Sequence, residues 1–211
     1  MKRLSFLPII LLVCLKITAQ TDNDAVKILD SFSAKAKAAP SISMKFDLVT
    51  VNQVEKTSDT LSGSVILSGD KYRLELPDNI VFFSGESSWS YLPAEKEVTV
   101  TKPDKKDNSF QNRPSAVFSM YKSGYKNRLI EEKQNTWIID LYPEDLKTEL
   151  MRIRLTIGKQ QLNLVSLEYR KKDGITSTLY VKEYNLAKKP APDTFTFQKD
   201  KYPGVDVIDM R

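Results

Sequence analysis

The chain has 211 residues, with 32 lysines and arginines against 27 aspartates and glutamates, and a formal net charge of +5. It contains no histidine and one cysteine, Cys14. Because histidine is the usual general base near neutral pH and the commonest metal ligand, a Ser-His-Asp or Cys-His catalytic site is excluded.

Residues 1–20 have the pattern of a secretory signal peptide. Lys2 and Arg3 precede the apolar run 4–13, which is too short for a helix that crosses a bilayer, and small residues follow at a position suited to cleavage. The alternatives are an N-terminal membrane anchor and, because of Cys14, a lipidated form. We expect an exported, soluble single domain over residues 21–211.

Cleavage would remove three basic residues and leave 29 basic and 27 acidic residues in the domain. A domain with a net charge of only +2 attracts a polyanion weakly, so we expect no nucleic-acid partner. Cys14 would leave as well, and with it any disulfide, thiolate nucleophile or cysteine metal site. We therefore predict no metal and no cofactor, and a domain that is stabilised by its core alone.

The domain opens with a predicted helix over 22–39, with Asp22 as the N-cap and Pro40 after its end. Its apolar residues recur at three- and four-residue spacing: Val26, Leu29, Phe32 and Ala36. From residue 42 the period changes to two, since apolar and polar residues alternate over 42–48. Such alternation is typical of a strand with one buried face.

Further strands are predicted over 60–68, 71–76, 80–83, 88–92, 97–102, 127–133, 136–141, 150–157, 162–170 and 175–184. Turns with glycine, proline or asparagine separate many of them, as in antiparallel hairpins. In the middle, a charged loop over 103–113 leads to a short predicted helix over 114–121, which begins at Pro114 and ends before Gly124. The fold class is mainly β with two helical segments, and a sheet of this size tends to curl.

Candidate catalytic groups do not converge. Residues 85–89 have a superficial likeness to a nucleophile elbow, but the second glycine and a histidine are missing. The close acid pairs are expected to be solvated surface charges: Glu131 and Glu132, Glu144 and Asp145, and Asp206 and Asp209. The basic pairs lack interleaved aromatic residues for stacking on bases: Lys105 and Lys106, Lys171 and Lys172, and Lys188 and Lys189. An enzyme that uses carboxylates is therefore the least favoured function.

The apolar inventory is the most unusual feature. Its members would mostly face one side of the curled sheet: Met44, Phe46, Leu48, Phe82, Trp89, Tyr91, Phe118, Met120, Trp137, Ile139 and Met151. They can form an ordinary core. Because only two helical segments would cover the sheet, they can also line an apolar ligand cavity.

Several segments, in their order, resemble a known family. The N-terminal pieces are Leu29-Asp30-Ser31-Phe32, Ile42-Ser43-Met44-Lys45-Phe46, and residues 61–67 and 72–76. The most specific piece is the hairpin over 80–91, in which Ser84-Gly85 is followed by Trp89-Ser90-Tyr91, and Phe195-Thr196-Phe197 before Pro203-Gly204 matches the end. Over nearly the whole domain, the chain resembles the periplasmic outer-membrane lipoprotein carrier family (LolA-like).

The resemblance implies a half-open antiparallel β-barrel of about 11 strands with an α-helical lid. It also implies a periplasmic carrier of lipoprotein acyl chains, which receives cargo from an inner-membrane ABC transporter and delivers it to an outer-membrane acceptor without chemistry. We expect a monomer. The expected lipid-binding residues are Met44, Phe46, Leu48, Phe82, Trp89, Tyr91, Phe118, Met120, Trp137 and Met151.

The resemblance has one departure. The family's strand arginine, which hydrogen-bonds the lid, falls at Gly69 or Asp70, so Arg73 is the predicted lid latch. Without the family arginine, two other functions stay open: a sensor or interaction module for mislocalised lipoproteins, and a carrier of another lipid in the same half-open barrel.

Overall fold

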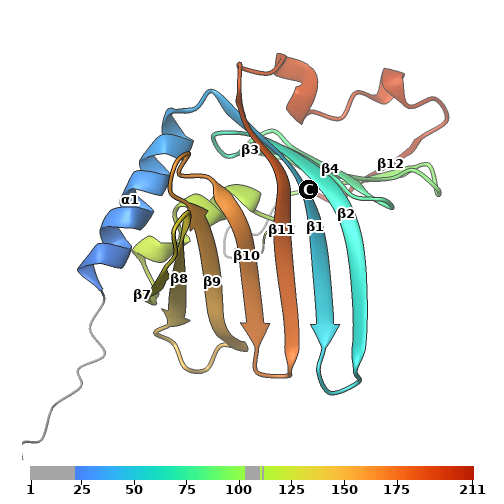
Figure 1. The fold of residues 1–211 in the computed structure, drawn as a ribbon. Helices are drawn as coiled ribbons and strands as arrows, with labels where there is room; N and C mark the ends of the chain where they lie inside the picture. Colours follow the sequence, from blue (N-terminus) through green and yellow to red (C-terminus); the bar gives the residue numbers. More distant parts are fainter. Residues whose placement is uncertain (1–21, 103–109, 111) are drawn as a thin grey trace, which may run out of the picture.

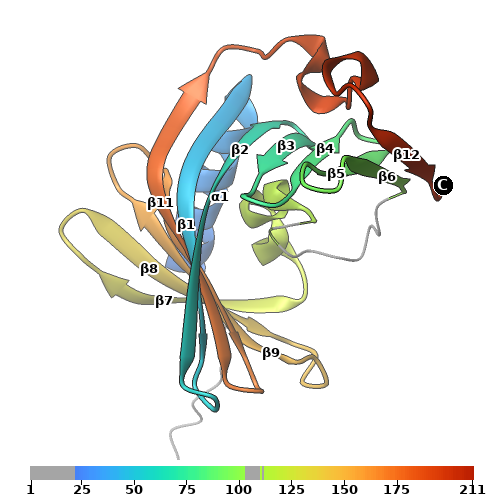
Figure 2. The same ribbon diagram turned by 90° about the vertical axis from the view of Figure 1, so that its right-hand side faces the viewer.

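The structure is a computed structural model that describes residues 22–102, 110 and 112–211. The predicted signal peptide and most of the predicted loop over 103–113 lie outside the described residues. In the described part, one α-helix packs against a 12-stranded sheet with the order β12-β6-β5-β4-β3-β2-β1-β11-β10-β9-β8-β7 (Figures 1 and 2). Because β12 and β7 are not neighbours, the sheet is curved but open.

The elements follow the sequence patterns closely. The helix is α1 (Asn23–Ala38), and the 3-10 turns are η1 (Pro114–Phe118), η2 (Met120–Lys122), η3 (Pro192–Phe195) and η4 (Lys199–Lys201). The first six strands are β1 (Ser41–Asn52), β2 (Thr57–Ser68), β3 (Lys71–Glu75), β4 (Ile80–Phe83), β5 (Ser88–Leu92) and β6 (Glu97–Thr101). The last six are β7 (Tyr125–Glu132), β8 (Thr136–Pro143), β9 (Leu150–Gly158), β10 (Leu164–Lys171), β11 (Ile175–Ala187) and β12 (Asp206–Asp209).

The predicted N-terminal helix is confirmed. The Asp22 carboxylate accepts a hydrogen bond from the Asp24 amide (2.9 Å), which satisfies one of the free N–H groups at the start of α1. The helix stops before Pro40. One stripe is buried, and it comprises Ala25, Leu29, Phe32, Ser33 and Ala36. This stripe fixes which side of α1 faces the sheet.

The period-two alternation of β1 defines two faces of the sheet. Met44 is opposite Val65, and Val65 is opposite Leu74, so these three residues share one face, which we call the inner face. The inner face carries the main core, to which α1 also contributes. Phe46 lies opposite Gly63, where an added Cβ would come within 2.7 Å of the Phe46 ring. A glycine at this position therefore leaves the space that the ring fills.

The second predicted helix is wrong in type. Residues 114–122 form the two 3-10 turns η1 and η2, with i to i+3 hydrogen bonds such as that from the Ala116 amide to the Arg113 carbonyl (2.9 Å). Side chains all around this segment are buried: Pro114, Ala116, Val117, Phe118, Met120 and Tyr121. A segment this short has little intrinsic helical stability, and packing against its surroundings decides its conformation.

The strand count differs by one from the prediction. Residues 206–209, expected to be part of a polar tail, form β12 and pair in parallel with β6. The preceding segment folds over the outer face of the sheet, the face opposite the inner one. There Phe197, Tyr202 and Val205 pack with Phe82, Tyr91 and Val98 in a separate apolar cluster. We call it the outer cluster.

A charged network lies on the outer face of β8, β9 and β10. Asp140 is 1% exposed and accepts hydrogen bonds from Arg154 (2.7 and 2.8 Å), Arg152 (3.1 Å) and the Tyr142 hydroxyl (3.0 Å). Arg152 also contacts Glu168 (2.7 Å). Burial by itself raises the pKa of Asp140, but the hydrogen bonds from Arg154 and Tyr142 and the charges of both arginines outweigh it, so this pKa lies below its usual value.

We predict that Asp140→Asn lowers the free energy of unfolding at pH 7 by about 3 kcal/mol, because two arginines lose a buried partner. A carboxylate with a lowered folded-state pKa stabilises the fold above its unfolded pKa of about 4, and this contribution disappears as the pH falls through the folded value. The variant should therefore lose less stability than the parent between pH 5 and pH 2 in urea titrations.

The matched control is Glu132→Gln, because Glu132 is an exposed carboxylate whose pKa is lowered by its hydrogen bond to Lys159. Its effect on the urea midpoint should be much smaller, as for other exposed ion pairs. Equal losses in both variants would contradict the role given to the Asp140 network.

Candidate functional site

The inner face is covered by two segments that are distant in sequence. Helix α1 packs on it with Leu29 and Phe32, and the η1–η2 segment packs on it with Phe118 and Met120. The rings of Phe32 and Phe118 lie 5.1 Å apart, so the two segments also contact each other. Together they shield part of the inner face from water.

A cavity of about 500 Å³ remains on the inner face. It runs across β1, β11, β10 and β9, which are neighbours in the sheet, and reaches Tyr125 of the edge strand β7. Its apolar lining comprises Leu48, Phe110, Leu150, Ile153, Leu167 and Leu179. Tyr169 and polar residues at or next to the strand ends complete it, and the latter are Thr50, Thr148, Glu149, Lys171 and Ser177. This combination of an apolar interior with a few polar groups is typical of sites for apolar ligands.

Residues next to the β1–β2, β8–β9 and β10–β11 turns line the cavity. These three turns lie at the same end of the sheet (Figure 1). A hydrogen bond from the Gln53 amide to the Gly174 carbonyl (3.2 Å) joins two of these turns. The Lys172 side chain donates to the Leu146 carbonyl (2.6 Å) and joins the third. These contacts stabilise the rim of the cavity.

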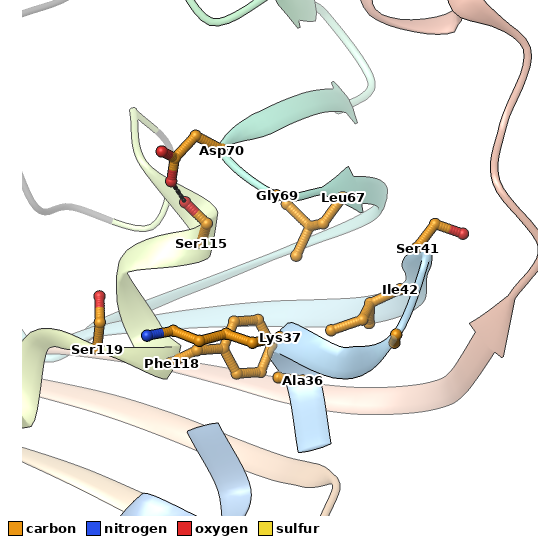
Figure 3. Close-up of a pocket in the computed structure, with 11 residues that line it drawn as sticks. Ala36, Lys37, Ser41, Ile42, Leu67, Gly69, Asp70, Ser115, Phe118 and Ser119 are labelled. Atoms are coloured by element: carbon orange, nitrogen blue, oxygen red, sulfur yellow. Dashed lines mark hydrogen bonds between the residues drawn. The ribbon is translucent and has the colours of Figure 1, made fainter. Parts of the chain in front are cut away.

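A smaller cavity of about 210 Å³ lies at the C-terminal end of α1. Figure 3 shows Phe118 and Ile42 as apolar walls, and Lys37 beside them. Ser115 of η1 donates to Asp70 in the β2–β3 turn at 3.5 Å, and this contact spans the cavity's edge (Figure 3). Packing between α1 and η1 is therefore incomplete at this end.

Polar contacts attach the covering segments to each other and to the sheet. The Tyr121 hydroxyl donates to Asp30 of α1 at 2.5 Å, and the Tyr72 hydroxyl donates to the Asn112 carbonyl at 2.9 Å. Burial, followed by the hydrogen bond to Asp30, raises the pKa of Tyr121 to about 12. Tyr121 is therefore a neutral donor at physiological pH and holds α1 on the η1–η2 segment.

Among the described residues, no helix combines the length and hydrophobicity needed to cross a membrane. No group of three or more aspartate, glutamate, histidine or cysteine side chains is placed to hold a metal ion in that same part of the chain.

Comparison with known families matches residues 15–172 to the outer membrane lipoprotein carrier protein LolA. The chain belongs to this family. No curated protein matches it significantly. LolA-like family members are carrier or binding proteins rather than enzymes.

Solved structures are similar to this chain, and the first of the following, with a TM-score above 0.5, shares its fold. An uncharacterized conserved protein from Thermus thermophilus is 12% identical, with a TM-score of 0.57, and the match covers 88% of this chain and 99% of that one. A LolA superfamily protein from Nitrosomonas europaea is 12% identical at a TM-score of 0.44, over 82% and 97% of the two chains. The lipoprotein LppX of Mycobacterium tuberculosis is also 12% identical, at 0.44 over 81% and 98%.

Six of the ten residues predicted to bind lipid lie on the inner side of this LolA-like sheet. Met44, Phe46, Phe118 and Met120 are buried in the main core, and Trp137 packs against it. Of the ten, only Leu48 lines the larger cavity, and Phe118 lines the smaller one. Lipid contact by these six residues stays a prediction.

The expectation of one shared face is wrong for three of the others. Ile66 on the outer face pairs with Arg73, and Arg73 pairs with Phe82, so Phe82 lies on the outer face. Trp89 pairs with Phe82 and shares this face. Tyr91 packs with Phe82 in the outer cluster. Period-two alternation separates the two faces of a strand but does not say which face is which. In β4 both faces carry apolar residues, and in β5 the aromatic residues lie on the outer face and Ser88 and Ser90 on the other, because the C-terminal segment covers the outer face.

The position of Met151 also differs from the prediction. It is 48% exposed, since a bulge in β9 places Leu150 opposite Lys171 and Arg152 opposite Arg170. Met151 is the extra residue, and Leu150 takes the place on the cavity wall that the alternation assigned to Met151.

Arg73, the predicted lid latch, lies on the outer face, away from α1. Its guanidinium contacts Glu75 (2.6 Å) and lies over the Phe82 ring (5.2 Å). Contacts that join neighbouring segments to α1 are instead the bond between Tyr121 and Asp30 and, at the N-cap, the bonds of Asp22 with β7. The alternation could have placed Arg73 on the face opposite Leu74, but Tyr121 carried no recognisable signal.

Sequence reasoning missed most of the cavity wall. Ile153, Leu167 and Leu179 all occupy buried positions of alternating strands that were predicted correctly. The preference for methionine and aromatic residues in the prediction passed over these aliphatic side chains. Phe110 was missed because the segment around it was expected to be a charged loop.

We predict that Tyr121→Phe loosens α1, because the hydrogen bond to the Asp30 carboxylate is lost at a cost of about 2 kcal/mol. Hydrogen exchange of the amides over 23–38 should become faster, with little change in the amides of β9 and β10. Tyr142→Phe is the matched control, since it removes the hydrogen bond between a tyrosine hydroxyl and the Asp140 carboxylate on the outer face, away from α1. Unchanged exchange in α1 of the Tyr121 variant would contradict the proposed attachment.

We predict that Phe82→Ala lowers the free energy of unfolding by about 3 kcal/mol, because a large ring leaves the outer cluster. Phe197→Ala should have a similar effect, since the two rings pack 5.9 Å apart. Both folded variants should bind a fluorescent acyl probe as tightly as the parent. A selective loss of binding with Phe82→Ala would show that this residue, despite its face, contributes to the ligand site.

Proposed function

We propose that the protein is a periplasmic carrier that holds acyl chains of lipoproteins in the cavity on the inner face and transfers them toward the outer membrane. The observation that supports this most is the apolar cavity of about 500 Å³ across β1, β11, β10 and β9, in a chain of the LolA family. Its volume falls within the range of about 300–1,000 Å³ that is usual for small-ligand sites.

The need for a carrier follows from the hydrophobic effect. Each buried methylene of an acyl chain is worth about 0.8 kcal/mol, so a long chain does not leave a membrane unless a protein replaces the lipid around it. Leu48, Ile153, Leu167 and Leu179 supply such surroundings. Glu149 and Lys171 at the strand ends lie where the polar end of a lipid would meet water.

Uptake and release require covers that can move. Helix α1 is attached by its apolar stripe and by a small number of polar contacts, including the bond between Asp30 and Tyr121. A ligand that replaces the apolar contacts of α1 or η1 would shift the equilibrium toward an open form. The incomplete packing at the C-terminal end of α1 supports an opening that starts there.

The proposal includes no chemical step. The sequence has no histidine, and the candidate acid pairs lie on exposed or partly exposed segments. We propose a monomer that receives cargo from an inner-membrane ABC transporter and passes it to an outer-membrane acceptor, as the family implies.

The test uses two neighbouring residues of β1 that face opposite sides. Leu48→Glu places a charge in the apolar cavity and should reduce the affinity for a fluorescent acyl probe at least tenfold. Val49→Glu adds the same charge to the same strand on the outer face and should leave the affinity within about twofold. Circular dichroism of both variants checks that the sheet is retained.

Equal affinity of the two variants would overturn the assignment of the cavity. A parent protein that binds no acyl probe, and that carries no lipid when it is extracted from a Gram-negative periplasm and examined by native mass spectrometry, would overturn the carrier function itself.

A further inference from the structure

A third hollow lies beside the larger cavity and shares one residue with it. This groove has a volume of about 590 Å³ and lies between α1, η2 and the start of β7. Its lining includes Val26 and Asp30 of α1, Tyr121 of η2, and Asn127 and Glu144. Tyr125 lines both this groove and the apolar cavity.

The position of Tyr125 in the sheet explains this double role. It is the first residue of β7, which is the last strand of the sheet and pairs only with β8 in the described part of the chain. The cavity crosses the strands toward this edge, where no further strand continues its wall. The Tyr125 side chain packs against the main core and stands where the apolar cavity and the groove meet.

The backbone holds Tyr125 in this place. Gly124 before it has a φ of +77°, a conformation that favours glycine, and its carbonyl accepts a hydrogen bond from the Glu144 amide (3.0 Å). Tyr125 itself pairs with Pro143 at the end of β8. Burial of Tyr125, which also raises the pKa of its hydroxyl, agrees with a ring that is held against the core.

We infer that Tyr125 closes the acyl cavity at the edge of the sheet and thereby sets the longest acyl chain that the protein accommodates. This inference rests on the proposed function, because it assumes that the cavity takes acyl chains. A chain that lies across the strands fills the cavity up to the Tyr125 ring. Additional methylenes beyond that length meet the ring and gain no burial.

The experiment measures dissociation constants for saturated fatty acids of increasing length, by displacement of a fluorescent acyl probe below their micelle concentrations. For the parent, each added methylene should tighten binding about fourfold until the cavity is full, after which the affinity levels off. With Tyr125→Ala, the cavity and the groove join, and this limit should move to chains longer by two carbons or more. Tyr125→Phe keeps the ring and should keep the parent's limit.

Tyr125→Trp gives an independent reading if the alanine variant does not fold, because the larger ring should move the limit to shorter chains. A limit that stays the same in both the alanine and the tryptophan variants would overturn the inference, as would an equal shift with Tyr125→Phe. These results differ from a failure of the proposed function, in which the parent binds no fatty acid of any length.

Discussion

The structure depends on the covering of one apolar surface. The inner face of the sheet is formed by aliphatic and aromatic side chains on both sides of the β1–β11 pair, and it is too apolar to face water across its whole width. Helix α1 and the η1–η2 segment cover most of it. Their own apolar residues, above all Phe32 and Phe118, are buried in the same core. The sheet, the helix and the inserted segment therefore stabilise one another.

Because the inner face is apolar, another apolar group can replace the contacts that α1 and the η1–η2 segment make with it. In the carrier function proposed above, an acyl chain would contact the inner face as Phe118 and Leu29 do, with apolar surface that needs no hydrogen bonds. Binding would then replace internal contacts rather than add to them, and the net affinity would reflect the difference between the two. Apolar packing alone does not fix the orientation of the covering segments. The hydrogen bonds at Asp30 and Asn112 hold α1 and the η1–η2 segment in one position.

The outer face has a different role at each end of the sheet. Over β8, β9 and β10 it carries the charged network around Asp140, which tolerates contact with water at its margins. Over β4, β5 and β6 it is apolar and is covered by the C-terminal segment with Phe197 and Tyr202. Trp89 and Tyr91 thus belong to a part of the fold that is distinct from the cavity, although they stand in the most recognisable piece of sequence.

Local patterns predicted the fold well and the site poorly. The stripe of α1 and the alternation of β1 are properties of adjacent residues, so the N-cap at Asp22 and the buried side of Met44 could be read from the sequence. The cavity depends on which strands become neighbours and on which residue is displaced by a bulge. Leu150 replaces Met151 on the wall for that reason, and no period in the sequence marks it. Likewise, Tyr125 lines the cavity from the first position of β7, and no local pattern marks that role.

The pairing of β1 with β11 has a consequence for how the chain becomes folded. It is the sole link between the two halves of the sheet in the described residues, and the Thr50 and Ser177 hydroxyls that meet across it are 127 positions apart in sequence. The parallel pair of β12 and β6 likewise joins the end of the chain to its middle. Contacts of such long range form slowly, because the conformational entropy of a long loop is lost before the contact stabilises the fold. A nascent chain that lacks its last third offers β1 only β2 as a neighbour, so the two halves of the sheet join only when synthesis is nearly complete.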